Sequence, residues 1–321
     1  MHQSSKRILL AGATGYIGRA VAAALLRAGH DVVALTRQSP TTDIDGYRWI
    51  SADITAPGAM AAATSDLQFD AVISCIASRT GAPRDAWAVE HDANLQLLQA
   101  AVDSGATQFV LLSAICVQRP RLAFQHAKLA FETRLMASGI DYSIVRPTAF
   151  FKSLSGQIER IRNGKPFLLF GDGTLTACKP ISADDLADYL IDCLHVPERR
   201  NQILPIGGPG PAITPREQGQ LLFDLAGIEP TFKSVSPKLL SGIAAVLTPL
   251  AKLLPPVATK AEFARIGHYY ATESMLLWDE QQQRYDADAT PSTGNTTLRE
   301  HYEAVLRDGI AGHEAGAHKL F

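Results

Sequence analysis

Apolar and polar positions in the first half of the chain follow two alternating patterns, short apolar runs and amphipathic helical segments. Segments with helical spacing cover residues 16–28, 87–105 and 124–138. The apolar runs between them are typical of strands covered on both faces and read RILLA, DVVALT, YRWISA, FDAVISCIA, FVLLSAI and YSIVRP. This alternation predicts an α/β fold, a Rossmann-type doubly wound parallel sheet.

After Pro147 the alternation stops. Residues 165–182 have the composition of short strands and turns, and residues 183–195 that of a helix with aspartates in its first turn. A Pro- and Gly-rich stretch at 205–215 precedes the C-terminal segment. We therefore expect a Rossmann domain over 1–150 and a smaller C-terminal region over 151–321, partly interwoven with the first.

The first strand leads into GATGYIG, which places glycines at Gly12, Gly15 and Gly18. Without Cβ atoms the backbone can turn tightly and approach a pyrophosphate, which the following helix N-terminus attracts. A dinucleotide site is favoured by the strand before and the helix after the motif, and the alternative is a purely structural turn. The other residues expected to bind this cofactor are Thr14, Tyr16, Ile17 and Arg19.

The end of the second strand indicates which dinucleotide binds. Thr36 and Arg37 stand there, where NAD-dependent enzymes usually carry a carboxylate for the ribose 2′-hydroxyl. An arginine pairs with a 2′-phosphate, so we expect NADPH, although Arg37 as a solvated surface residue is the alternative. Asp53 ends the third strand, where it either accepts a hydrogen bond from the adenine amino group or caps a loop.

Open doubly wound sheets bind ligands at the carboxyl ends of their strands. Cys75 and Ile76 end the fourth strand and are expected along the cofactor ribose. The same edge should bring Ser113 and the segment Pro147, Thr148, Ala149 and Phe150 to the nicotinamide, together with the helix that begins near Phe124.

That helix begins with FQHAK, Phe124 to Lys128. Many nicotinamide-dependent reductases carry a Tyr, three residues and a Lys in this place, with the phenol as proton donor. Here the Lys is present and the Tyr is a Phe, which cannot donate a proton. Either the chemistry is lost or the reaction needs no phenol, and ordinary amphipathic packing of Phe124 and Lys128 is the further alternative.

Charge and cysteine spacing exclude other classes of site. The formal net charge is −2, so we expect no nucleic acid partner. Cys75, Cys116, Cys178 and Cys193 are too far apart for a metal or cluster motif, so we expect reduced thiols and no metal. Few residues precede the first apolar run, and we expect a cytoplasmic protein without a targeting segment.

The stretches LSAICV, FQHAK, RPTAFFKSL, FGDG and ACKPIS, together with the glycine motif, resemble the NADPH-dependent divinyl chlorophyllide 8-vinyl reductases, of the extended and atypical short-chain dehydrogenase/reductase superfamily. Members of that family also carry Phe in place of Tyr. The resemblance implies reduction of the 8-vinyl group of divinyl chlorophyllide or protochlorophyllide to ethyl. It also implies that Lys128 holds the nicotinamide ribose hydroxyls, that Ser113 orients the substrate, and that the C-terminal region binds the tetrapyrrole.

Such a substrate would explain Phe124. Hydride addition to a vinyl group conjugated to a macrocycle spreads charge over many atoms, and the proton can arrive later. A phenyl ring also stacks on a flat apolar ligand. The proton donor itself stays open among His126, Lys152, Lys179, Tyr269 and Tyr270.

Two other functions share the cofactor site. One is reduction of another conjugated aromatic, such as a phenylpropanoid, and the other is a non-catalytic NADP-binding regulator of the nitrogen-regulator type. The apolar segment 239–254 is also open to three interpretations: core packing, a cap over the tetrapyrrole, or a peripheral membrane contact at the membrane surface. In each interpretation, one helical face carries Leu239, Ile243, Val246, Leu247, Leu250 and Leu254.

Overall fold

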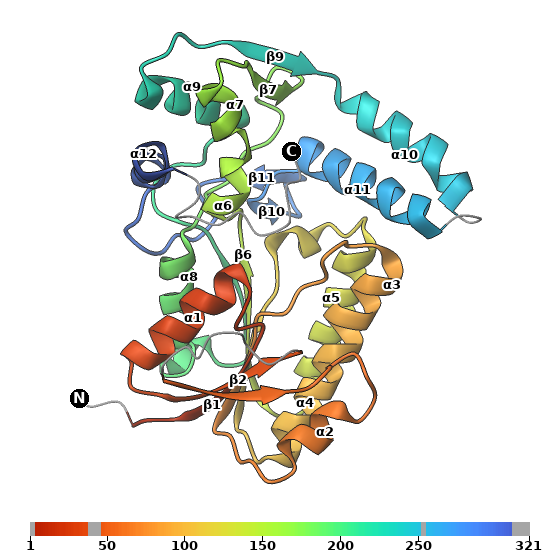
Figure 1. Cartoon of the computed structure of the whole chain (residues 1–321), viewed down its shortest axis with the longest axis vertical. Helices are drawn as coiled ribbons and strands as arrows, with labels where there is room; N and C mark the ends of the chain where they lie inside the picture. The colour runs from red at the N-terminus through yellow and green to blue at the C-terminus, as the bar shows by residue number, and fades with distance from the viewer. Residues whose placement is uncertain (1–3, 38–45, 252–254, 310–321) are drawn as a thin grey trace. The chain divides into compact units, whose positions relative to one another are not determined.

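A seven-stranded sheet forms the centre of the first of two units in the computed structural model, which describes residues 4–37, 46–251 and 255–309. Its strands are β1 (Arg7–Ala11), β2 (Asp31–Thr36), β3 (Tyr47–Ser51), β4 (Ala71–Ser74), β5 (Gln108–Leu112), β6 (Asp141–Pro147) and β8 (Gln202–Ile206). Their spatial order is β3-β2-β1-β4-β5-β6-β8, and each neighbouring pair from β3 to β6 is parallel. This order, which reverses at β1, confirms the predicted doubly wound fold (Figure 1).

Helices cover both faces of this sheet. They are α1 (Tyr16–Arg27), α2 (Ala59–Thr64), α3 (Pro83–Ala86), the π-helix η1 (Trp87–Ala93), α4 (Asn94–Asp103), the 3₁₀ helix η2 (Ile115–Gln118), α5 (Ala123–Met136), α8 (Ala183–Asp192) and the 3₁₀ helix η4 (Pro197–Arg199). Helix α1 packs against α8 on one face, and η1, α4 and α5 pack together on the other (Figure 1). Alternate residues of β1, Leu9 and Ala11, share a core with Leu97 and Phe131 of the second helical layer.

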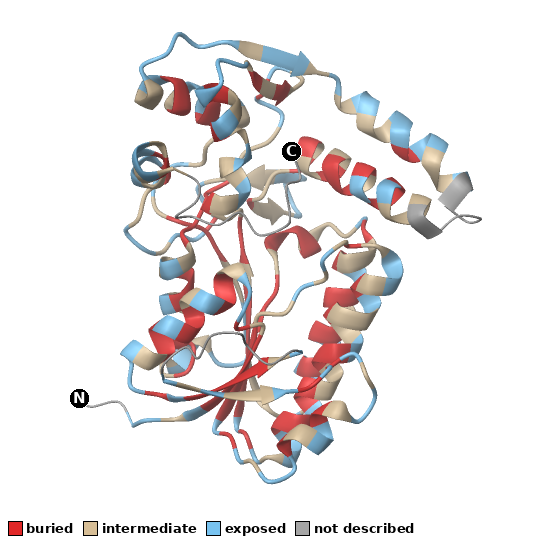
Figure 2. Ribbon diagram, viewed as in Figure 1, coloured by how far each residue is buried: buried red, intermediate tan, exposed pale blue. Residues whose placement is uncertain are grey.

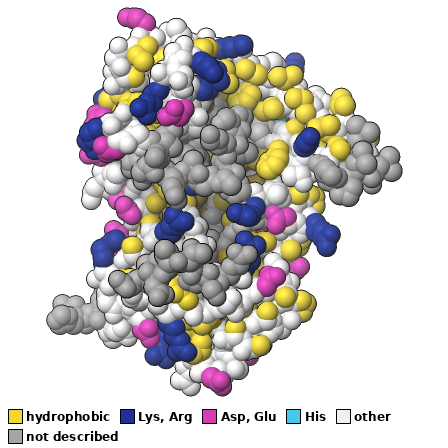
Figure 3. All heavy atoms as spheres, viewed as in Figure 1, with side chains coloured by type: hydrophobic (Ala, Val, Ile, Leu, Met, Phe, Trp, Pro, Cys, Tyr) yellow, Lys and Arg dark blue, Asp and Glu magenta, His cyan; other side chains and the backbone are white. Residues whose placement is uncertain are grey.

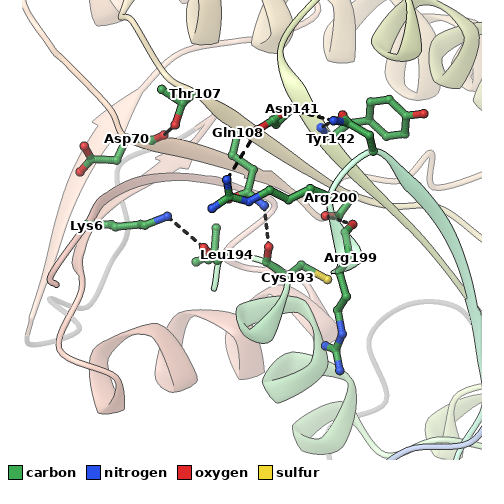
Figure 4. A network of polar contacts seen from close by, with 12 residues as sticks. Lys6, Asp70, Thr107, Gln108, Asp141, Tyr142, Cys193, Leu194, Arg199 and Arg200 are labelled. Atoms are coloured by element: carbon green, nitrogen blue, oxygen red, sulfur yellow. Dashed lines mark hydrogen bonds and ion pairs between the residues drawn. The ribbon is translucent and has the colours of Figure 1, made fainter. Parts of the chain in front are cut away.

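Residues 183–204, which fall within the region 151–321 that we expected to be partly interwoven with the Rossmann domain, belong to the first unit. The reason is long-range packing: one apolar face of α8 is buried on α1, and β8 extends the sheet beyond β6. Side chains from the amino ends of the strands then hold the end of α8. The Nζ of Lys6 donates to the carbonyl of Leu194 at 3.0 Å, and the Nε2 of Gln108 donates to the carbonyl of Cys193 at 2.5 Å (Figure 4).

The segment 87–105, predicted as one helix, begins instead with the seven-residue π-helix η1. Asn94 is buried where η1 meets α4, and its Nδ2 donates to the carbonyl of Glu90 at 3.0 Å. Its Oδ1 accepts a hydrogen bond of 2.6 Å from the hydroxyl of Ser74. Hydrophobic spacing does not distinguish an α-turn from the wider π-turn, so the sequence pattern could not indicate this difference.

The second unit consists of residues 79–82, 148–182 and 205–321. Its elements are α6 (Phe151–Leu154), the 3₁₀ helix η3 (Ser155–Gln157), α7 (Ile158–Arg162), β7 (Phe167–Phe170), α9 (Pro215–Ala226), β9 (Phe232–Val235), α10 (Pro237–Ala251), α11 (Pro255–Thr272), β10 (Leu277–Asp279), β11 (Arg284–Asp286) and α12 (Leu298–Asp308). Its buried core includes Phe151, Phe167, Phe223 and Tyr302 from α6, β7, α9 and α12 (Figure 2). A capping box, Thr214 with Glu217, fixes the start of α9.

Helices α10 and α11 of this unit pack against each other. The predicted apolar face of α10 does not enter a core, because Leu239, Ile243 and Val246 are exposed by 55%, 40% and 67%. The face that is buried carries Ala244 instead. Lys252 and Leu254 lie outside the described residues. No helix in the described part of the chain is long and apolar enough to cross a membrane.

Candidate active site

The glycine turn joins β1 to α1 and is closed by backbone contacts that leave no room for side chains. A Cβ on Gly18 would lie 1.9 Å from the carbonyl oxygen of Gly12, and a Cβ on Gly12 would lie 2.7 Å from the carbonyl carbon of Cys75. Gly12 also has a φ of +85°, which L side chains rarely adopt. The turn therefore holds strand β1, strand β4 and helix α1 at distances that only glycine permits.

Gly15 is the N-cap of α1 and is exposed, as is Thr14 before it. The first N–H groups of a helix have no intrahelical acceptor, and together with the helix dipole they attract an anion. Tyr16 is half-buried in this first turn, and Ile17 is buried behind it. Arg19 is exposed, and its Nε donates to the carbonyl of Thr14 at 3.1 Å. These residues fit the pyrophosphate of a dinucleotide.

Arg37 and Asp53 lie just beyond the carboxyl ends of β2 and β3, and both are exposed. The Oδ1 of Asp53 accepts hydrogen bonds from the hydroxyl and backbone N–H of Thr55 at 2.7 and 3.0 Å. These bonds hold the pKa of Asp53 below its usual value, and the charge of Arg37 acts in the same direction. Asp53 therefore does cap a loop, and its contact with adenine stays a prediction.

Cys75 and Ile76 follow β4 where the glycine turn approaches it. The N–H of Cys75 donates to the carbonyl of Ala11 at 2.9 Å. Burial raises the pKa of the Cys75 thiol to about 12, and the charge of Lys128 only partly opposes this shift. The thiol is therefore neutral at physiological pH and lines the site as a small apolar group. All four cysteines are free thiols.

Helix α5 places Phe124 and Lys128 one turn apart on the same side. Phe124 is half-buried, and Lys128 is only 8% exposed. Gln125 between them is fully buried and fixes the start of the helix. Its Oε1 accepts hydrogen bonds from the backbone N–H groups of residues 121 and 122 at 2.7 and 2.9 Å, and its Nε2 donates to the carbonyl of Cys116 at 3.1 Å.

The ammonium group of Lys128 is paired with a carboxylate from the π-helix. Its Nζ lies 2.7 Å from the Oε2 of Glu90, whose side chain is 2% exposed. The other carboxylate oxygen, Oε1, accepts a hydrogen bond of 2.9 Å from the backbone N–H of Ser78. A buried ion pair thus joins α5, η1 and the segment that follows β4.

Ser113 lies beyond β5, where its hydroxyl donates to the Oε1 of Glu132 on α5. Glu132 is 1% exposed and also forms an ion pair with Arg146 of β6. The Ser113 hydroxyl thus has a partner inside the first unit, and its predicted role in orienting the substrate stays a prediction.

Pro147 ends β6, and the three residues that follow it belong to the second unit. There the N–H of Thr148 donates to the carbonyl of Ile206 at 2.9 Å, and the carbonyl of Ala149 accepts from the N–H of Ile181 at 2.9 Å. Phe150 also forms a β-bridge with Ile181. These contacts order the segment, and its expected contact with the nicotinamide stays a prediction.

The candidate proton donors differ in their surroundings. His126 is exposed on α5, whereas the buried Nζ of Lys179 donates to the carbonyl of Thr290 at 2.9 Å. Tyr269 is buried with its ring edge-to-face on that of Tyr270, at a centroid distance of 5.6 Å. None of these contacts selects the donor.

Sequence reasoning did not find three buried residues of this site, Glu90, Gln125 and Glu132. Each lies at a position of a helix that the amphipathic pattern would leave polar and exposed. A signal did exist for Glu132, because it follows Lys128 at the same spacing of four at which Lys128 follows Phe124. No comparable local signal connects Glu90 with Lys128.

Comparison with known proteins agrees with this geometry. The model of a family described as NAD(P)H-binding matches residues 12–197. Solved structures with the same fold include the UDP-glucose 4-epimerase of Thermotoga maritima, with a TM-score of 0.69, 18% identity and coverage of 96% of this chain and 100% of that one. The NADPH-dependent quinone oxidoreductase QOR2 of Escherichia coli has a TM-score of 0.67 and 18% identity, covering 93% of this chain and 99% of that one.

Much higher identity is found among curated relatives. The protein of Oryza sativa subsp. indica named divinyl chlorophyllide a 8-vinyl-reductase, chloroplastic, is 48% identical over 335 residues, which cover 99% of this chain and 83% of that protein. The protein of the same name from Arabidopsis thaliana is 44% identical over 328 residues, which cover 96% of this chain and 79% of that protein. The similarity therefore spans both units, and the chain belongs to the family of divinyl chlorophyllide a 8-vinyl-reductases.

Proposed function

We propose that this protein reduces the 8-vinyl group of divinyl chlorophyllide or protochlorophyllide to an ethyl group, with NADPH as the hydride source. The observation that carries the proposal is the identity of 44–48% to the plant reductases over 96–99% of the chain. The retained Lys128 and the Phe124 one turn before it support the same reaction.

The cofactor supplies the hydride, and the residues of the first unit bind and orient it. The glycine turn and the first turn of α1 hold the pyrophosphate. Arg37 pairs with the 2′-phosphate, which makes NADPH the preferred cofactor over NADH. Lys128 binds the nicotinamide ribose, and the neutral thiol of Cys75 lines the same side of the sheet.

Phe124 contributes an apolar surface where many related reductases have a proton-donating phenol. Its half-buried ring offers a face for a flat macrocycle to stack on. Because the macrocycle delocalises the charge that the hydride brings, no donor is needed at this position, and the proton arrives from another acid or from water.

A second part of the proposal is that α10 contacts the surface of a membrane with anionic lipids. Leu239, Ile243 and Val246 are exposed on this helix, and Figure 3 shows hydrophobic side chains gathered over the region where Figure 1 draws it. The one charged residue of α10 is the cation Lys238. An apolar helical face with one basic and no acidic residue suits an interfacial helix. We propose a cytoplasmic location for the protein itself.

The central experiment is an enzymatic assay. The purified protein is incubated with NADPH and divinyl chlorophyllide, and in parallel with divinyl protochlorophyllide, and the Soret band is followed. A blue shift of the band with NADPH, slower with NADH, is the expected result. NADPH binding without turnover of either tetrapyrrole would contradict the proposal and favour a non-catalytic regulator or a reductase of another conjugated aromatic.

The membrane contact is tested separately by flotation with vesicles of phosphatidylglycerol and phosphatidylcholine. The wild type should float, and the variant Ile243→Ser/Val246→Ser should float much less. Equal flotation of the two proteins, or none of the wild type, would exclude α10 as the membrane contact. Gln220→Ser, an exposed change on α9, is the control.

A further inference from the structure

Glu90 is a charged residue in an unusual setting within the first unit. It is 2% exposed and belongs to the seven-residue π-helix η1. π-Turns are rare and are found frequently at functional sites. Burying a carboxylate is costly unless it is paired and hydrogen-bonded, so its presence here requires an explanation.

The contacts of Glu90 fix it on several sides. Its Oε1 accepts from the N–H of Ser78 at 2.9 Å, and its backbone carbonyl accepts from the Nδ2 of Asn94 at 3.0 Å. Asn94 is in turn bonded to Ser74 at the end of β4 at 2.6 Å. The carboxylate is thus held to the carboxyl edge of the sheet, where the glycine turn also lies.

One oxygen of this carboxylate is directed at Lys128. Oε2 lies 2.7 Å from the Nζ, yet it is one of two buried side-chain polar atoms in the described residues with no hydrogen bond of good geometry. The contact is therefore an ion pair without a well-aligned hydrogen bond. Oε2 can still accept a hydrogen bond from another group. Stability does not account for it, because replacing a buried ion pair with apolar residues is often neutral or stabilising.

We propose that Glu90 is a positioning residue, which holds the ammonium group of Lys128 aimed at the nicotinamide ribose. Lys has a long flexible side chain, and a buried ammonium group without a partner would be free to turn toward solvent. The π-helix η1, which carries Glu90, packs against α5, and the Glu90 carboxylate reaches Lys128 across this contact. This inference rests on the cofactor role proposed for Lys128.

The test is a double-mutant cycle with Glu90→Gln, Lys128→Met and the double variant, all in the full-length chain. The dissociation constant for NADPH is measured by quenching of protein fluorescence, and kcat and KM by the Soret shift. We expect Glu90→Gln to weaken NADPH binding by about tenfold and to lower kcat by roughly 10- to 100-fold through misplacement, with little change in the tetrapyrrole KM. Adding Glu90→Gln to Lys128→Met should then cost nothing more.

Two further variants separate positioning from a general structural role. Glu90→Asp keeps the charge on a shorter side chain and should recover part of kcat. Asp31→Asn removes the carboxylate of a half-exposed ion pair at the amino end of β2, 2.6 Å from Arg7, and should leave kinetics unchanged. A Glu90→Gln variant with wild-type NADPH affinity and kcat would overturn the proposal. A double variant whose loss of NADPH affinity equals the product of the two single losses would overturn it as well, because the two residues would then act independently.

The cycle on NADPH binding needs no tetrapyrrole. The wild type could reduce neither tetrapyrrole while Glu90→Gln and Lys128→Met still had non-additive effects on NADPH affinity. The proposed reaction would then be wrong, but the positioning role of Glu90 would be supported. Thermal unfolding of each variant shows whether a loss of affinity reflects a loss of fold.

Discussion

Buried or half-buried polar side chains stand at both edges of the central sheet, and their partners differ. At the amino edge, Lys6 and Gln108 donate to main-chain carbonyls at the end of α8 (Figure 4). Those carbonyls have no partner inside their own helix, and cations are favourable near a helix C-terminus. The side chains there satisfy groups that the fold itself leaves open, and they stabilise the return of residues 183–204 to the first unit.

At the carboxyl edge, the cations Lys128 and Arg146 pair with the carboxylates Glu90 and Glu132. Neither partner is a backbone group that had to be satisfied, and replacing a buried ion pair with apolar residues is often neutral or stabilising. Burial of charge alone therefore does not identify a site. A buried charge whose partner is another side chain, beside a turn that only glycine can form, does indicate one.

The largest effect should follow from Gly18→Ala at the carboxyl edge. The new Cβ would lie 1.9 Å from the carbonyl oxygen of Gly12, so the turn or the helix must move. We expect more than about a 100-fold loss of NADPH affinity in fluorescence titration, together with a lower unfolding midpoint. Gly242→Ala in α10, where nothing lies within 4 Å, is the control: it should leave NADPH affinity unchanged and should not lower the unfolding midpoint, because Ala is favoured over Gly inside a helix. Wild-type affinity in Gly18→Ala would exclude the turn as the dinucleotide site.

Arg37→Ala, also at the carboxyl edge, should weaken the binding of NADPH and not that of NADH. If Arg37 pairs with the 2′-phosphate as proposed, this charge-assisted bond contributes about 1.5–3 kcal/mol, so NADPH should bind roughly 10- to 100-fold more weakly. NADH, which lacks the phosphate, should bind about as it does to the wild type. Parallel titrations with both cofactors measure this, and an equal loss for both would show that Arg37 does not contact the phosphate.

Phe124→Ala removes a half-buried ring and should raise the KM for the tetrapyrrole by about tenfold, because a stacking contact contributes roughly 1–2 kcal/mol. Phe124→Tyr keeps the ring and should leave kcat near the wild-type value. Steady-state kinetics with divinyl chlorophyllide compare the two. A large gain in kcat for Phe124→Tyr would mean that proton donation at this position limits the rate, which our explanation of Phe124 does not allow.

Gln108→Leu tests the amino edge. It leaves the carbonyl of Cys193 without its buried donor, which should cost about 1–3 kcal/mol of the free energy of unfolding. Urea denaturation should show the loss, whereas kcat, KM and the NADPH dissociation constant should stay unchanged. A change in NADPH affinity in a protein that remains folded would break the distinction between the two edges.

The smallest effect concerns the histidine pair near Lys6. The Nε2 atoms of His30 and His195 lie 3.2 Å apart, and the Nδ1 of His30 accepts from the N–H of Lys6 at 3.2 Å. His30 therefore donates its one proton from Nε2 to His195. Burial, and then the positive charges of the neighbours, lower the pKa of both rings.

A lowered folded pKa means that the unfolded chain takes up protons first as the pH falls. Stability from this pair should be complete above the usual histidine pKa of about 6.5 and decline below it. Thermal midpoints between pH 8 and 5.5, compared with those of His30→Phe, measure the decline. A wild type whose midpoint falls no more steeply than that of the variant would contradict this assignment.

The sequence by itself determined the local features of this protein. Strand and helix periods located strands β1 to β6 and helices α1, α5 and α8 to within a few residues, since those periods depend on neighbours along the chain. Segment 31–36 was predicted and found as β2, and α1 ends one residue before the predicted end at Ala28. Glycine spacing located the turn, and Phe124 and Lys128 were placed on one face by their separation of four.

Tertiary structure decided the features that join distant parts of the chain. The sheet order brings η1 beside α5, and only that contact pairs Glu90 with Lys128. Packing on α1 and the bonds from Lys6 and Gln108 assign α8 to the first unit, and packing on α11 decides which face of α10 is covered. A hydrophobic pattern predicts that a helix or strand face will be buried. Which element covers that face depends on the free energy of the whole fold, and a local pattern does not predict it.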